Sequence, residues 1–232
     1  MVSPRSCVVC GAQLGLEEDD SCLGCESELP YTFFWTRRRN EMAEKINLRV
    51  REGLSDGVFE PYSYAAALFF YRVESEYKHI PVALKYGADL HVGRHYAANL
   101  AGKLRLAPWF DDVDAVVCVP LHLLRRLRRG YNQAEVIGAE IARVMGVDFI
   151  KGALRRTRFT RSQTRVGAEA RKANVSGAFK ARRSALEGRH HVLLVDDTFT
   201  TGSTLYACIR ALRSALLPGL RVSVVTLAYV GQ

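Results

Sequence analysis

The apolar residues after position 57 alternate between two patterns, one typical of helices and one typical of strands. Apolar residues at helical spacing predict helices at YSYAAALFFYRVESEY (62–77), HVGRHYAANLAGKLRL (91–106), QAEVIGAEIARVMG (133–146) and from Ser203 to about Leu216. Short apolar runs predict strands at AVVCVP (115–120), VDFIKGAL (147–154), HVLLVD (191–196) and RVSVVTLAYV (221–230). Strands that alternate with helices indicate an α/β fold with a parallel sheet and helices on both faces.

The N-terminal part of the chain has a different pattern. The stretch from Cys7 to Cys25 is short, rich in turn-forming residues and contains the acidic run EEDD, whereas the residues from about 31 to 53 are charged and compatible with a helix. We therefore expect three regions, which are a cysteine-containing module (1–35), a helical linker (36–57) and the α/β domain (58–232).

The composition is that of a globular protein with one substantial core. Hydrophobic residues make up 48% of the 232 positions, enough for one large domain and a small satellite module. The longest apolar run, YAAALFFY, ends before Arg72 and is far shorter than the roughly 18–20 residues of a membrane span. The first ten residues, MVSPRSCVVC, lack the apolar segment of a secretion signal. We therefore expect a cytoplasmic protein that does not insert into a membrane.

The charge distribution favours phosphate-bearing partners. The formal net charge is +9, and residues 151–183 hold eleven Lys or Arg residues against one acid, Glu169. Charge alone does not distinguish a nucleic acid from a nucleotide, and a basic surface loop with no ligand is an equally simple interpretation.

The six cysteines are expected to be reduced, because disulfides belong to oxidising compartments. Two of them, Cys118 within AVVCVP and Cys208 within a predicted helix, are best interpreted as small buried hydrophobic residues. The other four form two pairs, CVVC and CLGC, separated by eleven residues.

These two pairs have the spacing of a structural metal site. Two residues between cysteines let both thiolates of a turn face one ion, and two such turns complete a tetrahedral site. We therefore predict that a zinc-ribbon-like module binds structural Zn²⁺ through the four thiolates of Cys7, Cys10, Cys22 and Cys25. An iron–sulfur cluster and a reactive dithiol remain as alternatives.

The stretch LLVDDTFTTGST (193–204) combines two acids with a hydroxyl-rich turn. Asp196 and Asp197 follow a predicted buried strand, at the edge where open α/β sheets bind ligands. The residues before and at the start of the next predicted helix can surround a phosphate with amides and hydroxyls; they are Thr200, Thr201, Gly202, Ser203 and Thr204. The carboxylates repel a phosphate, so they require hydroxyl groups or a metal. A ribose 5-phosphate unit satisfies both halves, whereas simple helix capping needs only one such residue.

This stretch resembles the phosphoribosyl diphosphate signature of type I phosphoribosyltransferases. The resemblance implies a sheet of that type, with Asp196 and Asp197 on the ribose hydroxyls as the catalytic pair. It also implies that Thr200 to Thr204, together with Thr198, bind the 5-phosphate side of the ligand and that Mg²⁺ accompanies the diphosphate.

A second cluster, VPLHLLRRLRRGYNQAEVIG, follows the strand predicted at 115–120. Pro120 and Leu121 occupy the end of that strand. The arginines that follow (Arg125, Arg126, Arg128 and Arg129) are placed to neutralise a diphosphate, with Arg125, Arg126 and Arg129 as the candidates. The alternative is that they form the exposed face of a short helix.

Several segments together resemble the ComF family of phosphoribosyltransferase-like competence proteins. They are the paired CxxC motifs, LKYGADLHVGRHYAANLAGKL with Lys85, CVPLH…RRLRRGYNQA, RTRFTRSQT…EARKANVSGAF and the acidic motif at 193–204. Gln163, Arg171 and Asn174 match a family pattern that by fold analogy belongs to a mobile loop, although Val166 stands where the family often has leucine. The resemblance implies a role in DNA import during natural transformation, with helicase-like and DNA-processing competence proteins as possible partners.

Three functions are therefore open. The chain is an enzyme that transfers the phosphoribosyl group to an acceptor, a nucleotide-sensing adaptor that keeps the pocket without transfer, or a protein that binds single-stranded DNA through its basic stretch. The last is less favoured because Arg155 to Arg165 include one aromatic residue, Phe159, where base stacking requires several. The sequence identifies no general base and no acceptor.

Overall fold

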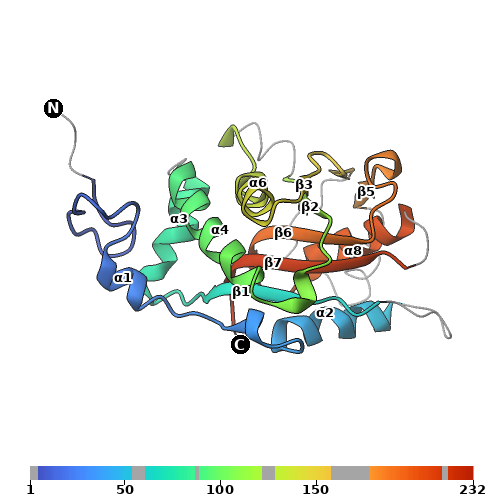
Figure 1. Cartoon of the computed structure of the whole chain (residues 1–232), viewed down its shortest axis with the longest axis horizontal. Coiled ribbons are helices and arrows are strands. Elements are labelled where there is room, and N and C mark those ends of the chain that lie inside the picture. Colours follow the sequence, from blue (N-terminus) through green and yellow to red (C-terminus); the bar gives the residue numbers. More distant parts are fainter. Residues whose placement is uncertain are drawn as a thin grey trace, which may run out of the picture.

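The computed structural model describes residues 5–53, 61–86, 89–121, 129–157, 178–215 and 219–231. Its centre is a five-stranded sheet with the order β1-β7-β6-β2-β3, in which every neighbouring pair is parallel (Figure 1). The strands are β1 (Ala65–Phe70), β2 (Ala115–Cys118), β3 (Asp148–Phe149), β6 (His191–Phe199) and β7 (Arg221–Tyr229). The predicted parallel α/β sheet is confirmed.

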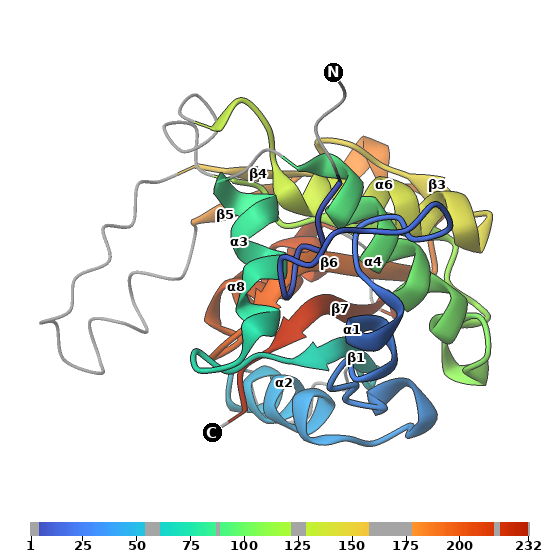
Figure 2. The same ribbon diagram turned by 90° about the vertical axis from the view of Figure 1, so that its left-hand side faces the viewer.

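Helices cover both faces of this sheet because its crossovers run in opposite directions. From β1 the chain moves through α3 (His79–Tyr86) and α4 (Leu90–Leu104) to β2, then through α6 (Gln133–Met145) to β3. From β6 it moves the other way, through α8 (Ser203–Ala215) to β7. Right-handed crossovers in opposite directions place their helices on opposite faces. Accordingly α4 packs against α6, whereas α2 (Glu41–Glu52) packs against α8 and runs beneath β1 (Figures 1 and 2).

The segment 62–77 is a strand where the sequence pattern predicts a helix. β1 pairs in parallel with β7, from Ala65 opposite Val224 to Phe70 opposite Tyr229, and its first five residues are buried. A strand that is covered on both faces has no polar side to mark a period of two. A continuous apolar run therefore fits a buried helix and a buried strand equally well.

The strand predicted at 147–154 is divided in two. β3 ends at Phe149, and a turn containing Gly152, whose φ is +70°, leads into β4 (Leu154–Arg156). β4 pairs with β5 (Phe179–Ala181) in a separate antiparallel ribbon. The positive φ at Gly152 favours glycine and redirects the chain out of the main sheet.

The predicted helices at 91–106, 133–146 and 203–216 correspond to α4, α6 and α8, up to the described end of α8 at Ala215. Local caps explain where α6 begins and ends. The side chain of Asn132 accepts a hydrogen bond from the amide of Ala134 at 3.2 Å, and Gly146 ends the helix with a φ of 73°.

The N-terminal segment packs onto the sheet before α2 begins. After the short helix α1 (Leu23–Ser27), the carbonyl of Pro30 accepts from the amide of Phe70 at 2.8 Å, and the amide of Thr32 donates to the carbonyl of Leu68 at 3.1 Å. Asn40 caps α2 and also donates to the carbonyl of Ala65 at 2.8 Å. The division into regions 1–35, 36–57 and 58–232 stays a prediction.

Within the described residues, no helix has the length and apolar character needed to cross a membrane.

We expect Gly138→Ala to lower the free energy of unfolding by roughly 1–3 kcal/mol, the usual cost of overpacking a core. A Cβ at Gly138 of α6 would lie 2.5 Å from the Sγ of Cys118 and 3.2 Å from the ring of Phe149. Gly102→Ala on α4 is the matched control, because no heavy atom lies within 4 Å of its added Cβ. This control should be neutral or stabilise by up to about 1 kcal/mol. Equal unfolding midpoints in urea for both variants would contradict the tight α6–β2 contact.

Candidate functional site

The carboxyl ends of β2 and β6 form the point where the crossovers reverse direction. Open α/β sheets bind ligands at such a reversal, in the crevice outside the strand ends. The amide of Val119 donates to the carbonyl of Val195 at 2.9 Å, so Pro120 and Leu121 leave β2 beside the acidic pair on β6. The fold therefore brings two of the predicted site segments together.

The acidic pair lies within β6 and not after its end. The sequence pattern places the end of this strand at Asp196, but pairing with β7 continues through Asp196 opposite Thr226 to Phe199 opposite Tyr229. Asp196 and Thr198 are both paired with β7, so Asp197 between them also lies within the strand. The two carboxylates are thus held on a rigid element rather than on a loop.

A turn suited to an anion follows directly. Thr200 and Thr201 are exposed, and Gly202 has a φ of 72° with a neighbouring aromatic ring 2.9 Å from where a Cβ would lie. Glycine is therefore required at this position on both counts. The hydroxyls of Thr201 and Ser203 are 3.0 Å apart, and α8 begins at Ser203 with Thr204 exposed beside it. The free amides of a first helical turn favour negative charge, so this turn can surround a phosphate.

Lys85 reaches the site from the last turn of α3. Its Nζ is 3.2 Å from Oδ2 of Asp197 and donates to Oγ1 of Thr198 at 3.4 Å. These two side chains are largely shielded, with 27% of Lys85 and 16% of Asp197 exposed. The structure thus places Lys85 and Thr198, both named from the family resemblance, next to the acidic pair.

The two carboxylates are not equivalent. Desolvation, followed by the charge of Asp197, raises the pKa of Asp196 to about 8, although the amide of Asp197 and the nearby Lys85 act in the opposite direction. Lys85 therefore faces two carboxyl groups, and Asp196 largely keeps its proton near neutral pH while no ligand is bound. Hydroxyl donors or a cation such as Mg²⁺ fit this donor set, because both favour the ionised carboxylate.

Only part of the predicted diphosphate-binding and mobile-loop set can be placed. Arg129 lies over the ring of Tyr86, 5.2 Å from its centre, and the hydroxyl of Tyr131 donates to the carbonyl of Leu84, so this segment contacts the end of α3. The other predicted residues lie outside the described part of the chain; they are Arg125, Arg126, Arg128, Gln163, Arg171 and Asn174. The same holds for most of the basic stretch.

A cavity of about 350 Å³ lies at the carboxyl ends of β2 and β3, next to Pro120 and Leu121. Its polar lining is mainly basic, from Lys151, Arg155 and Arg156, with Glu135 paired to Lys151 at 3.1 Å. Such a lining favours an anionic group close to the acidic pair.

Cys118 also borders this cavity, but it is not a reactive thiol. Burial raises its pKa well above the ordinary value, and its Sγ donates to the carbonyl of Ala134 at 2.8 Å. Cys208 is likewise buried, with a raised pKa. Both agree with the interpretation of these cysteines as small buried residues.

Sequence reasoning missed one residue at the turn between β6 and α8. Arg49 of α2 donates from Nη1 to Oγ of Ser203 at 3.3 Å. The two residues are 154 positions apart, so no local pattern could join them.

The four N-terminal cysteines form a second site. Their sulfurs all lie within 4.8 Å of one another, and those of Cys10 and Cys22 are 3.8 Å apart. Sulfurs bound tetrahedrally at about 2.3 Å from zinc are also about 3.8 Å apart. Burial, and then hydrogen bonding with neighbouring thiols, raises the pKa of Cys25. The cluster can therefore hold a metal ion such as zinc.

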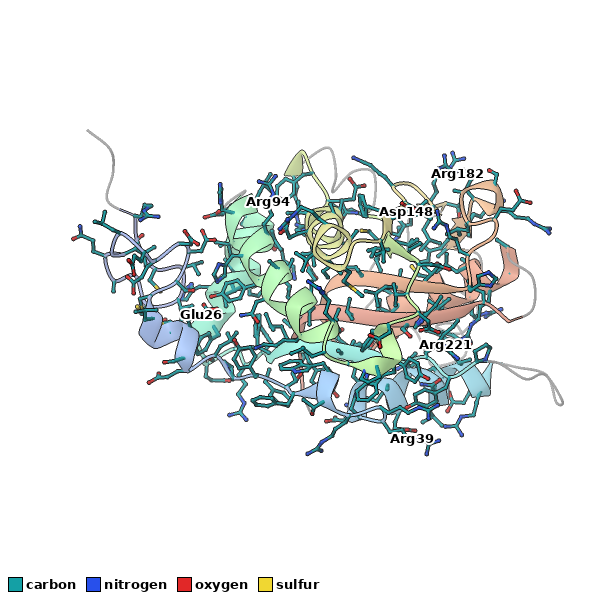
Figure 3. All side chains as sticks on the ribbon, viewed as in Figure 1. Glu26, Arg39, Arg94, Asp148, Arg182 and Arg221 are labelled. Atoms are coloured by element: carbon teal, nitrogen blue, oxygen red, sulfur yellow. The ribbon has the colours of Figure 1, made fainter. Side chains whose placement is uncertain are left out.

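Polar contacts attach this cluster to the body of the protein. Glu26 of α1, labelled in Figure 3, lies within 3.3 Å of Nε2 of His95 and accepts from Asn99 of α4 at 3.2 Å. The hydroxyl of Tyr77 donates to the carbonyl of Cys25 at 2.9 Å. The four-cysteine cluster is thereby fixed against α4.

The described fold is a doubly wound α/β domain with a four-cysteine segment attached. No protein-family model matches the chain. Over 101 residues, 43% of its length, it is 36% identical to Competence protein F of Haemophilus influenzae, and the match spans 44% of that protein. Over 92 residues, 40% of its length, it is 39% identical to DNA utilization protein YhgH of Escherichia coli K12, again spanning 40% of the relative. The chain thus matches less than half the length of these curated relatives. They confirm the predicted resemblance to ComF competence proteins.

Two solved structures give partial matches. Glutamine phosphoribosylpyrophosphate amidotransferase from B. subtilis, in complex with ADP and GMP, is 20% identical with a TM-score of 0.39 and covers 59% of this chain and 27% of its own. A structure of the allosteric regulatory enzyme of purine biosynthesis is 19% identical with a TM-score of 0.38 and covers 58% and 26%.

The four-cysteine site predicts one bound metal ion per chain. Cys10→Ser and Cys25→Ser should each reduce the metal content, measured by plasma mass spectrometry, from about one equivalent to near zero, because four thiolates are needed for a closed site. Cys208→Ala removes a thiol far from the cluster and should keep the metal. Full metal content in both serine variants would contradict the site.

The raised pKa of Asp196 predicts that the ligand-free protein loses stability as the pH rises. The folded state holds this proton more tightly than the unfolded chain, so the free energy of unfolding should fall between pH 4 and about 8. Asp196→Asn should remove this dependence and be more stable than the unsubstituted protein by roughly 1–3 kcal/mol at pH 8.

Urea unfolding at pH 5 and pH 8 measures this difference. Asp111 is exposed and lies shortly before β2, at the amino ends of the strands and away from the acidic pair. Asp111→Asn is therefore the control and should follow the unsubstituted protein. An Asp196→Asn variant that loses as much stability as the unsubstituted protein between the two pH values would show that this carboxyl is not the cause.

Proposed function

We propose that this chain is a phosphoribosyltransferase-like protein that binds phosphoribosyl diphosphate at the reversal between β2 and β6. The carboxylates of Asp196 and Asp197 accept hydrogen bonds from the ribose hydroxyls, and residues 200–204 hold the 5-phosphate. The observation that carries this proposal is the arrangement of three neighbouring elements. The acidic pair lies in the last part of β6, a turn suited to an anion follows that strand directly, and α8 begins after the turn.

Mg²⁺ belongs to this proposal because the ligand carries a diphosphate that needs neutralising. When bound, the ion would stabilise the charge on the departing diphosphate. The chain itself orients the ribose through its acidic pair, and Lys85 forms an ion pair with Asp197 at 3.2 Å. The basic residues near Pro120, among them Lys151 and Arg155, favour the diphosphate arm.

Transfer would break the bond between C1 of the ribose and the diphosphate oxygen, and a nucleophile would form the new bond at C1. The sequence identifies no general base that would remove a proton from that nucleophile. Binding without transfer, as in a nucleotide-sensing adaptor, is therefore the second form of the same proposal, and the pocket is common to both.

The biological setting is inferred from the relatives. Competence protein F and the DNA utilization proteins match 40–43% of the chain, and we propose a role in DNA uptake with competence proteins and single-stranded DNA as partners. We further propose that the four-cysteine ion is structural Zn²⁺, because four thiolates in tetrahedral spacing suit it, and that the protein works in the cytoplasm, where these thiols stay reduced.

Isothermal titration with phosphoribosyl diphosphate and Mg²⁺ tests the pocket. The unsubstituted protein should bind, and Asp197→Asn should weaken binding by roughly tenfold or more, the size expected when a charge-assisted hydrogen bond is lost. Asp111→Asn, at the amino ends of the strands, should bind normally. A folded, metal-loaded protein that gives no heat would overturn the proposal.

Measuring diphosphate release in the presence of a panel of nucleobases then separates the two forms. Release that depends on one base identifies a transferase, whereas binding without release identifies a sensor.

A further inference from the structure

The helix α2 meets α8 at the turn that follows the acidic pair. Near the end of α2, a Cβ at Gly53 would overlap the hydroxyl of Tyr206, so the two helices approach closely there. One turn earlier, Nη1 of Arg49 donates to Oγ of Ser203 at 3.3 Å. Two contacts therefore place the guanidinium of Arg49 at the first residue of α8.

The position of Arg49 is fixed by the packing of its helix. The adjoining face of α2 is buried through Met42, Ile46 and Val50. Asn47 adds a polar anchor, because its side chain accepts from the amide of Ser63 at 2.9 Å and donates to its carbonyl at 2.8 Å. The backbone of Arg49 is thus held by the packing of α2, and its side chain reaches Ser203 at the start of α8.

The guanidinium retains most of its capacity to bind. Arginine has five N–H donors, and within the described part of the chain Arg49 makes the one hydrogen bond to Ser203 and no ion pair. The acceptor, Ser203, also contacts Thr201 at 3.0 Å, so the guanidinium ends beside two hydroxyls of the anion-binding turn. A guanidinium with free N–H donors at this point attracts an anionic group such as phosphate, as the free amides at the start of α8 do.

We propose that Arg49 is a phosphate-binding residue, which supplies a guanidinium from α2 to the phosphomonoester held at the start of α8. This inference rests on the proposed function and adds a residue outside the motif that suggested it. Guanidinium groups bind phosphate oxygens in pairs and remain charged at all physiological pH values. Arg49 would therefore favour a 5-phosphorylated sugar over the same sugar without its phosphate.

Arg49 could instead only fasten α2 to α8, and substitutions distinguish the two roles. Arg49→Ala removes charge and donors, Arg49→Gln keeps a polar side chain without charge, and Arg49→Lys keeps the charge but loses the paired geometry. Arg51→Ala removes the same charge from the same helix. Arg51 is exposed, lies 3.9 Å from Glu44 and donates to the carbonyl of Asn47 at 3.4 Å. It is thus the matched control for net charge.

The experiment is titration of each variant with ribose 5-phosphate, and separately with inorganic diphosphate and Mg²⁺. We expect Arg49→Ala and Arg49→Gln to bind ribose 5-phosphate roughly tenfold or more weakly, the size expected for a lost charge-assisted hydrogen bond, and Arg49→Lys to be intermediate. Arg51→Ala should match the unsubstituted protein. Diphosphate binding should not change in any variant.

The outcomes separate this inference from the function on which it rests. If the unsubstituted protein binds ribose 5-phosphate and all Arg49 variants bind it equally well, Arg49 only fastens the helices and the inference is wrong. An equal loss of diphosphate affinity would also overturn it, because the effect would then be general electrostatics. If the unsubstituted protein binds neither ribose 5-phosphate nor phosphoribosyl diphosphate, the proposed function fails as well. Should Arg49→Ala unfold, Arg49→Lys and Arg49→Gln carry the same comparison.

Discussion

Hydrogen bonding between β2 and β6 is the interaction on which the site depends. Four residue pairs join these strands, from Ala115 opposite Val192 to Cys118 opposite Val195, and the side chains of this pairing are almost all buried. Polar chemistry begins where the pairing ends, with the acidic pair on one strand and the Pro120 segment on the other. A shift in this register would move the acidic pair away from the Pro120 segment, so the same contacts that stabilise the fold also align the site.

The cost of that alignment is electrostatic. Asp196 is held on a regular strand beside a second carboxylate, with Lys85 as the nearby cation. A protein selected only for stability would place an amide or an apolar residue here. Functional sites commonly retain such unfavourable charge because a ligand relieves it on binding. The cysteine cluster follows the same logic, since four close thiolates would repel one another and a metal ion could relieve that repulsion.

The sequence is most informative where the signal is local. The spacing of the cysteines, the turn around Gly202 and the apolar periods of α4, α6 and α8 all lie within short windows, and the structure places each as expected. The sequence pattern fails at β1, where burial on both faces removes the polar side that would reveal a strand. It also cannot find Arg49, because only the packing of α2 on α8 joins that residue to Ser203. Tertiary contacts between distant segments are the information that a single sequence lacks.

The backbone contacts of Pro30, Thr32 and Tyr31 with β1 have a consequence for the outer border of the sheet. β1 is a border strand, and an uncovered border strand of apolar residues is a template for pairing with other molecules. The antiparallel bridge between Tyr31 and Phe69 blocks part of that template, and the opposite border is formed by β3, which is only two residues long. The N-terminal segment therefore covers part of the edge of β1. Removing it to isolate the α/β domain would expose the unpaired backbone of this strand, which favours self-association.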